Sequence, residues 1–340
     1  MGQRMWRFAR GCAVAVLLAA FVTACTPLRD WLTPAPDAPA EWAALVQEVR
    51  AFERGIGFTG TGNFTSATED KADYPFCGYA SRWVLPYSYQ DPAITWVGGI
   101  TESECKALAG EDDVFFEVSE AVGEVGTPVT PAMLTSKLDR FLYLILHEDC
   151  HDQFDLPYGV EEALCEVITY KAMVAFGDAK YGPQAREDRE LRRYAETQSR
   201  RTRAMTAYYA QLAALYARFE RKELAPEALL REREAVYGNA SRPLGIPLAK
   251  LNNVRMANGM TYSRHYALVE AVFEAQGGDL ARTVAFFRQV DARKPSRAAV
   301  LKRLGLQGPE AENRLVFVRA YEEAVVETVR KRLAETTPAR

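Results

Sequence analysis

The chain has 340 residues, of which 48% are hydrophobic and 26% are charged. This composition is that of an ordinary globular protein, and it excludes a disordered, collagen-like or multi-span membrane chain. The 42 Lys and Arg residues against 45 Asp and Glu give a net charge of −3. No overall positive field therefore favours a nucleic acid, and no nucleic-acid partner is expected.

The first residues are typical of a secretory signal peptide. Three arginines precede a short apolar run over residues 11–22, which ends in Val22-Thr23-Ala24-Cys25. That ending resembles the lipobox of bacterial lipoprotein precursors, in which the signal is cleaved before a cysteine that receives lipid. The resemblance implies removal of residues 1–24 and lipidation of Cys25. An ordinary signal peptide or an uncleaved anchor is the alternative.

A lipid on Cys25 implies attachment to a membrane in the bacterial cell envelope. The next residue is Thr26 rather than Asp, which by analogy with lipoprotein sorting favours the outer membrane, facing the periplasm. Residues 25–40 hold four prolines without periodicity and are predicted to be a tether. Residues 41–340 are predicted to form a single domain.

The first part of that domain is predicted to be mixed. A helical pattern covers residues 41–52. Thr101, followed three residues later by Glu104, predicts the capped start of another helix. Short strands are expected at 83–85, 94–97 and 113–119.

From Thr130 onward the pattern is almost entirely helical. Thr130-Pro131 is typical of a helix start, and apolar residues then recur at helical spacing. A second helix is predicted over residues 160–176, ending at Gly177. Further helices are predicted over 183–222, 225–236, 260–276, 279–290 and 309–333. The predicted fold class is α+β, dominated by helices, with a small N-terminal strand region.

The sequence His147-Glu148-Asp149-Cys150-His151 is an H-E-x-x-H motif at the end of a predicted helix. The i, i+4 spacing places both imidazoles on one helical face, where they can hold one metal ion while Glu148 reaches a water beside it. Zn²⁺ fits this ligand set and is the expected cofactor. Two histidines without a metal, on the surface or in the core, are the alternative.

A catalytic zinc site needs a third protein ligand. Glu162 lies eleven residues beyond His151, at the start of the next predicted helix. The loop between them contains a proline and a glycine, so the second helix can fold back on the first. Glu162 is therefore the predicted third ligand. Glu166, one turn later, is predicted to accept the free ring N–H of a ligand histidine. Acidic enrichment in a first helical turn is the alternative explanation for Glu161 and Glu162.

The H-E-x-x-H helix followed by Glu162-Ala163-Leu164-Cys165-Glu166 resembles the gluzincin group of zinc metallopeptidases, whose third ligand comes from a following glutamate helix. A closer likeness, over residues 110–295, is to the bacterial family described as predicted aminopeptidases. The features that correspond to the family's motifs are the strand at 113–116, the segment 131–136, the metal motif, Asn252-Asn253-Val254 and Tyr262. Asp149-Cys150 and Glu161 depart from that family's pattern.

The resemblance implies a zinc-dependent peptidase with a zincin-like core, acting on a peptide or protein substrate. Glu148 is then the general base, and Tyr262 and His265 are the candidate donors to the oxyanion. Two alternatives stay open. One is a non-catalytic periplasmic lipoprotein with a structural metal site, and the other is a zinc amidase that acts on cell-wall peptide. Glu148 favours an enzyme, because a structural site needs no general base.

Four cysteines follow the tether, and an oxidising compartment favours disulfides between them. Cys77, Cys105, Cys150 and Cys165 permit three pairings. Cys150 precedes one predicted ligand, and Cys165 lies three residues beyond another. Convergence of both helices on one ion brings these two thiols close and leaves Cys77 with Cys105. Alternatively, Cys150 and Cys165 are small, buried apolar residues without a bond.

Overall fold

A computed structural model describes residues 40–68, 74–119 and 126–336. The predicted signal peptide, Cys25 and nearly all of the predicted tether lie outside these ranges. Helices dominate, and one small three-stranded antiparallel sheet lies in the N-terminal part. The fold is helix-dominated α+β, as the sequence predicts. Within the described ranges, no helix combines the length and apolar character that crossing a membrane requires.

The sheet consists of β1 (Tyr74–Ala80), β2 (Thr95–Gly98) and β3 (Asp113–Ser119), in the order β2-β1-β3. Helix α4 (Ala40–Gly55) precedes it, and α5 (Glu102–Ala109) connects β2 to β3. The predicted capping box of α5 is confirmed, because Thr101 accepts from the backbone N–H of Glu104 and Glu104 accepts in return. A disulfide between Cys77 and Cys105 joins β1 to α5.

The prediction of a strand at 83–85 is wrong. This segment turns instead, and side chains take the carbonyl groups that a neighbouring strand would use. The Tyr216 hydroxyl donates to the carbonyl of Arg82 at 2.7 Å, and Nδ2 of Asn253 donates to that of Val84 at 2.8 Å. The strand β1 lies just before this turn, and its proline and glycine, which are depleted in strands, hide it from pattern analysis.

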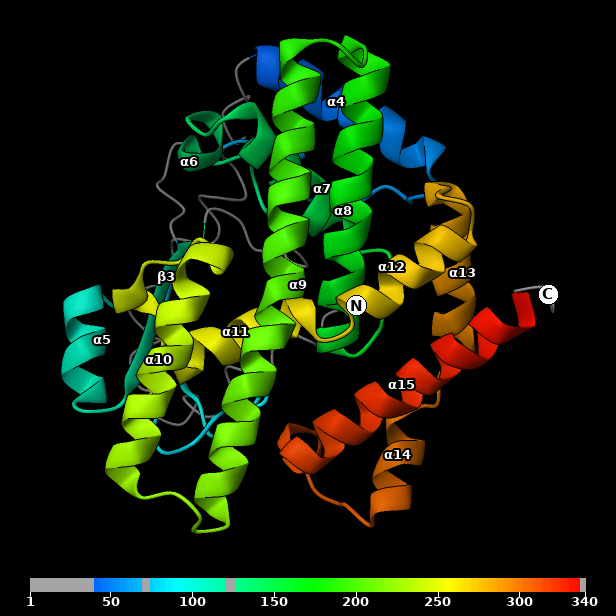
Figure 1. The fold of residues 1–340 in the computed structure, drawn as a ribbon. Coiled ribbons are helices and arrows are strands. Elements are labelled where there is room, and N and C mark those ends of the chain that lie inside the picture. The colour runs from blue at the N-terminus through cyan, green and yellow to red at the C-terminus, as the bar shows by residue number, and fades with distance from the viewer. Residues whose placement is uncertain (1–39, 69–73, 120–125, 337–340) are drawn as a thin grey trace, which may run out of the picture.

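The rest of the described chain is almost entirely helical (Figure 1). Its helices are α6 (Pro131–Leu134), α7 (Leu138–His151), α8 (Tyr158–Tyr181), α9 (Arg186–Glu220), α10 (Pro226–Leu244), α11 (Asn253–Ser263), α12 (Tyr266–Ala275), α13 (Leu280–Arg293), α14 (Arg297–Leu304) and α15 (Leu315–Thr336), with 3₁₀ turns at Leu248–Lys250 and Ala311–Asn313. Figure 1 shows α8 and α9 side by side, with the sheet and α10 to one side and α12 to α15 to the other.

Two of the predicted helices are each divided in two. The helix predicted from Pro131 onward ends at Leu134, and α7 begins only at Leu138. The hydroxyls of Thr135 and Ser136 donate to carbonyl groups of α6 and end it. The helix predicted over 260–276 is likewise two helices, α11 and α12.

Helix α8 continues past its predicted end. Gly177 lies inside it, and the helix ends at Tyr181, before Gly182 with φ of 86°. Gly177 serves a packing purpose instead, because a Cβ there would lie 3.1 Å from Oδ1 of Asp188 on α9. The glycine therefore allows close approach of the two helices rather than a helix end.

Helix α8 is the central element of the fold. It contacts α7, α9, α11, α12, α13 and α15, and it is apolar on nearly all sides, as expected of a helix buried in the core. The main hydrophobic cluster extends from Leu45 on α4 to Val329 on α15. Tight packing of α7 on α8 fixes the C-terminal end of one helix against the N-terminal half of the other.

Candidate metal centre

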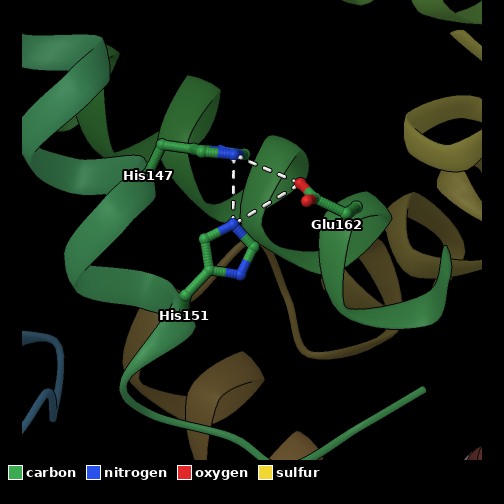
Figure 2. Close-up of side chains that lie close together, drawn as sticks. All are labelled: His147, His151 and Glu162. Carbon is green, nitrogen blue, oxygen red and sulfur yellow. Dashed lines mark hydrogen bonds and ion pairs between the residues drawn. The ribbon is translucent and has the colours of Figure 1, made fainter. Parts of the chain in front are cut away.

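Three buried side chains from α7 and α8 converge at this helix contact (Figure 2). Nε2 of His147 lies 3.3 Å from Oε2 of Glu162, and Nε2 of His151 lies 3.5 Å from the same oxygen. The two Nε2 atoms are 3.3 Å apart. The structure thus brings together the three residues that the sequence predicts as metal ligands.

The three atoms fit a metal ion. A tetrahedral ion about 2.0–2.1 Å from each nitrogen or oxygen has ligand atoms about 3.3–3.4 Å apart, close to the edges of this triangle. All three atoms offer lone pairs, and burying them together without a cation costs free energy. Among the described residues, they form the one group of three or more His, Cys, Asp or Glu side chains that could hold a metal.

The convergence follows from two antiparallel helices and a short loop. His147 and His151 are one turn apart on α7, and the chain then reverses into α8. A disulfide between Cys150 and Cys165 joins the two helices beside the triad, with the Cα atoms 5.6 Å apart. Both disulfides of the structure have the predicted pairing. Two disulfides indicate that this part of the chain folds in an oxidising, extracellular or periplasmic environment.

Glu161 orients one of the ligands. Its Oε1 lies 3.3 Å from Nδ1 of His151, and its Oε2 accepts from the backbone N–H of Leu156 at 2.8 Å. Because a carboxylate only accepts, Nδ1 donates in this contact, and Nε2 is the nitrogen left to bind a metal. The sequence assigns no role to Glu161 and offers first-turn acidity only as the alternative explanation for Glu161 and Glu162. Its position next to Glu162 was the available signal.

Glu166 does not have the predicted partner. Its Oε1 accepts from the Tyr143 hydroxyl at 2.8 Å, while Nδ1 of His147 has no hydrogen-bond partner among the described residues. The helices run antiparallel. Glu166, one turn after Glu162 on α8, therefore lies beside Tyr143, one turn before His147 on α7. Burial and the charge of Glu162 raise the pKa of Glu166 to about 7, against the effects of His147 and Tyr143.

The charges around the triad favour binding of a cation. Burial would raise the pKa of Glu162, but the neighbouring histidines hold it well below its usual range. Burial would lower the pKa of His151, yet the carboxylates of Glu162 and Glu161 raise it well above its ordinary value. The buried carboxylates therefore favour positive charge at the centre of the triangle.

Glu148 is half-buried beside the triad. Its backbone carbonyl accepts from Nδ2 of Asn63 at 3.3 Å. Its carboxylate is close enough to contribute, after burial and the other carboxylates, to the raised pKa of Tyr262. The general base and the oxyanion donor predicted from the sequence therefore share one neighbourhood.

Three tyrosines from separate elements surround Glu162. Tyr262 of α11 lies with its ring centroid 6.4 Å from that of His147. Tyr158 lies one turn before Glu162 on α8, and burial, then the charge of Glu162, raises its pKa well above the ordinary value. The Tyr89 ring lies 5.8 Å from that of Tyr158. Burial, then the charge of Glu162, raises the pKa of Tyr89 to about 12. These phenols stay protonated at neutral pH and can donate hydrogen bonds. The i, i+4 spacing was the missed signal for Tyr158.

His265 is placed differently. Its Nε2 lies 3.3 Å from Oε2 of the buried Glu322 on α15, and the Tyr87 hydroxyl donates to the same oxygen at 2.9 Å. The imidazole of His265 is thus already in contact with the Glu322 carboxylate. Its predicted role as a donor to substrate stays a prediction.

No protein-family model, curated protein or solved structure matches this chain. The fold and the site alone therefore define its class: a helix-dominated α+β protein with two disulfides and a buried His-His-Glu group fit for a metal ion.

Proposed function

We propose that this chain is a zinc-dependent peptidase of the gluzincin type. The observation that carries the proposal is the triangle of His147, His151 and Glu162, with edges of 3.3 to 3.5 Å. Two imidazoles and one carboxylate, with a general-base candidate on the same helix, are typical of hydrolytic zinc sites. The resemblance of the motif sequence to the predicted aminopeptidases supports the same reaction.

The residues of the site have separable roles in such a hydrolysis. Zinc, when bound by the triad, supplies Lewis acidity toward a peptide carbonyl and a water. Glu148 takes the proton of the attacking water and delivers it to the leaving amine. Tyr262 donates its hydroxyl hydrogen to the developing oxyanion, and Glu161 holds His151 in the tautomer that presents Nε2. Burial of the triad excludes bulk water, which strengthens each of these interactions.

A structural metal site is the second candidate, and one observation favours it. The ligand side chains are almost fully buried, with at most 8% exposed. Structural zinc sites are closed, whereas catalytic sites keep an open position for water or substrate. The two candidates differ in what Glu148 contributes, because only catalysis requires it.

The experiment that separates them compares wild type with Glu148→Gln, using purified protein and a panel of free and N-blocked peptides. We expect wild type to hydrolyse at least one peptide, and Glu148→Gln to keep its zinc but lose about 10²–10⁴ in turnover. Equal turnover in both proteins removes Glu148 from the reaction. A folded, zinc-loaded wild type that cleaves none of the peptides favours the structural site.

We also propose that the mature chain begins at Cys25, carries lipid there and faces the periplasm from the outer membrane. The lipobox-like residues before Cys25 and the two disulfides support this location. Metabolic lipid labelling of the Cys25→Ser precursor checks it. We expect no label in that variant, and wild-type labelling of it rejects the anchor.

A further inference from the structure

Glu322 is a buried carboxylate that the proposed reaction does not use. It lies on α15, close to the end of the chain, and only 2% of its surface is exposed. Its Oε2 accepts from Tyr87 at 2.9 Å and lies 3.3 Å from Nε2 of His265. Burying a carboxyl group this deeply carries a desolvation cost, so its location needs a physical explanation.

The other carboxylate oxygen faces the helix that carries the metal ligand. A Cβ built on Gly159 would lie 2.6 Å from Oε1 of Glu322. Gly159 belongs to the first turn of α8, three residues before Glu162, and α15 contacts α8. The absence of a side chain at Gly159 is thus what lets the carboxylate approach the start of this helix.

The start of α8 lacks a cap of its own. Its N-cap residue is Pro157, which makes no side-chain capping bond. The first turn of a helix presents free N–H groups and partial positive charge, which a nearby carboxylate stabilises. Glu322 places a carboxylate there from a helix more than 150 residues later in the sequence.

We infer that Glu322 is a positioning residue for the metal centre, which fixes the first turn of α8 so that Glu161 and Glu162 meet the two histidines of α7. The inference rests on the proposed metal function. Through Tyr87 and His265, the same carboxylate also ties the loop before Tyr89 and the start of α12 to that turn. The C-terminal helix thereby contributes to metal affinity without touching the ion.

The chain offers a matched control at the opposite end of α8. Asp188 is also a fully buried carboxylate, and its Oδ1 lies 3.1 Å from a Cβ built on Gly177. Both pairs join a buried acid to a glycine of the same helix, but only the Glu322 and Gly159 pair adjoins the turn that carries the ligand. A general destabilisation of α8 follows from changes at either end of the helix. Positioning of Glu162 depends only on the end that contains Gly159.

The test measures the Kd for Zn²⁺ by chelator competition in the full chain, beside thermal unfolding of the metal-free proteins. We expect Glu322→Gln and Gly159→Ala each to weaken zinc binding about tenfold. This is the lower end of the roughly 10–100-fold loss typical of residues that position a metal ligand without binding the metal. We expect all four variants to lower the melting temperature. Asp188→Asn and Gly177→Ala, however, change the Kd for Zn²⁺ by less than about twofold. Tyr87→Phe, which removes one donor to Glu322, weakens binding slightly and serves if Glu322→Gln does not fold.

Unchanged zinc affinity in Glu322→Gln and Gly159→Ala overturns the inference, as does equal weakening in the two control variants. In both cases wild-type zinc binding, and with it the proposed function, still stands. A folded wild type that binds no Zn²⁺ overturns the proposed function and this inference together.

Discussion

Oε1 of Glu161 lies 3.3 Å from Nδ1 of His151, on the far side of the imidazole from the other two ligands. This one contact decides which nitrogen of His151 faces the triad, and it adds a second negative charge beside Glu162. A histidine ligand with a carboxylate partner binds a metal more strongly because its orientation and tautomer are already set.

Glu161→Ala is therefore expected to weaken zinc binding about 10–100-fold. Glu161→Gln should lose less, because an amide oxygen still accepts from Nδ1. Chelator competition on the two variants provides the comparison. Equal affinities in wild type and Glu161→Ala show that the contact does not matter for the metal.

The disulfide beside the triad should affect both stability and metal binding. Replacing Cys150 and Cys165 together by Ala opens a loop with a sequence separation of 15, and we expect a loss of about 3 kcal/mol in the free energy of unfolding. It should also weaken zinc binding, because the bond fixes the glutamate helix against the histidine helix.

The matched control replaces Cys77 and Cys105, which join β1 to α5 away from the triad. That variant should lose comparable stability in denaturant unfolding but keep wild-type zinc affinity. If both double variants bind zinc as wild type does, the bond beside the triad is not part of the metal site.

Glu53 should make stability depend on pH. Burial, followed by the charge of Asp149, raises the pKa of Glu53 to about 9, so the folded protein keeps a proton that the unfolded chain releases above about pH 4.5. The folded state therefore binds more protons, and the free energy of unfolding falls between these pH values, by up to about 1.4 kcal/mol per pH unit.

Glu53→Gln keeps a donor toward Asp149 but cannot ionise. Its unfolding free energy should fall less from pH 5 to pH 9, and it should exceed that of wild type at the alkaline end. Denaturant unfolding at a series of pH values gives both curves. Parallel curves for the two proteins contradict a raised pKa at Glu53.

Tyr262 and His265 should differ in their effect on turnover. Tyr262 lies beside His147 and feels the charges of Glu162 and Glu148, whereas His265 is engaged by Glu322. We expect Tyr262→Phe to lower kcat about 10²–10³-fold, the range for loss of an oxyanion donor, with zinc content and KM nearly unchanged. His265→Gln should lower kcat less. A larger loss in His265→Gln reverses the assignment.

The metal motif could be predicted from the sequence because its information is local. The i, i+4 spacing of His147 and His151 fixes both imidazoles on one face, and the short loop to Glu162 leaves few ways to pack the next helix. The pairing of Cys150 with Cys165 follows from the same convergence.

The partners around the motif could not be predicted in the same way. Glu166 was assigned to a ligand histidine because it lies one turn beyond Glu162. The antiparallel packing of α7 and α8 places it against Tyr143 instead. Glu322 contributes from a helix far away in the sequence, so no spacing rule connects it to Glu162. The strand expected at 83–85 failed for a related reason, since distant side chains take its carbonyl groups.

The most direct test of the metal centre is the zinc content of the purified, folded protein after removal of metal and dialysis against limiting Zn²⁺, compared with His151→Ala. The site predicts one zinc ion per wild-type chain and a loss of at least most of it in His151→Ala, with circular dichroism showing both proteins folded. Full zinc content in His151→Ala, or a folded wild type that takes up none, contradicts a metal centre at His147, His151 and Glu162.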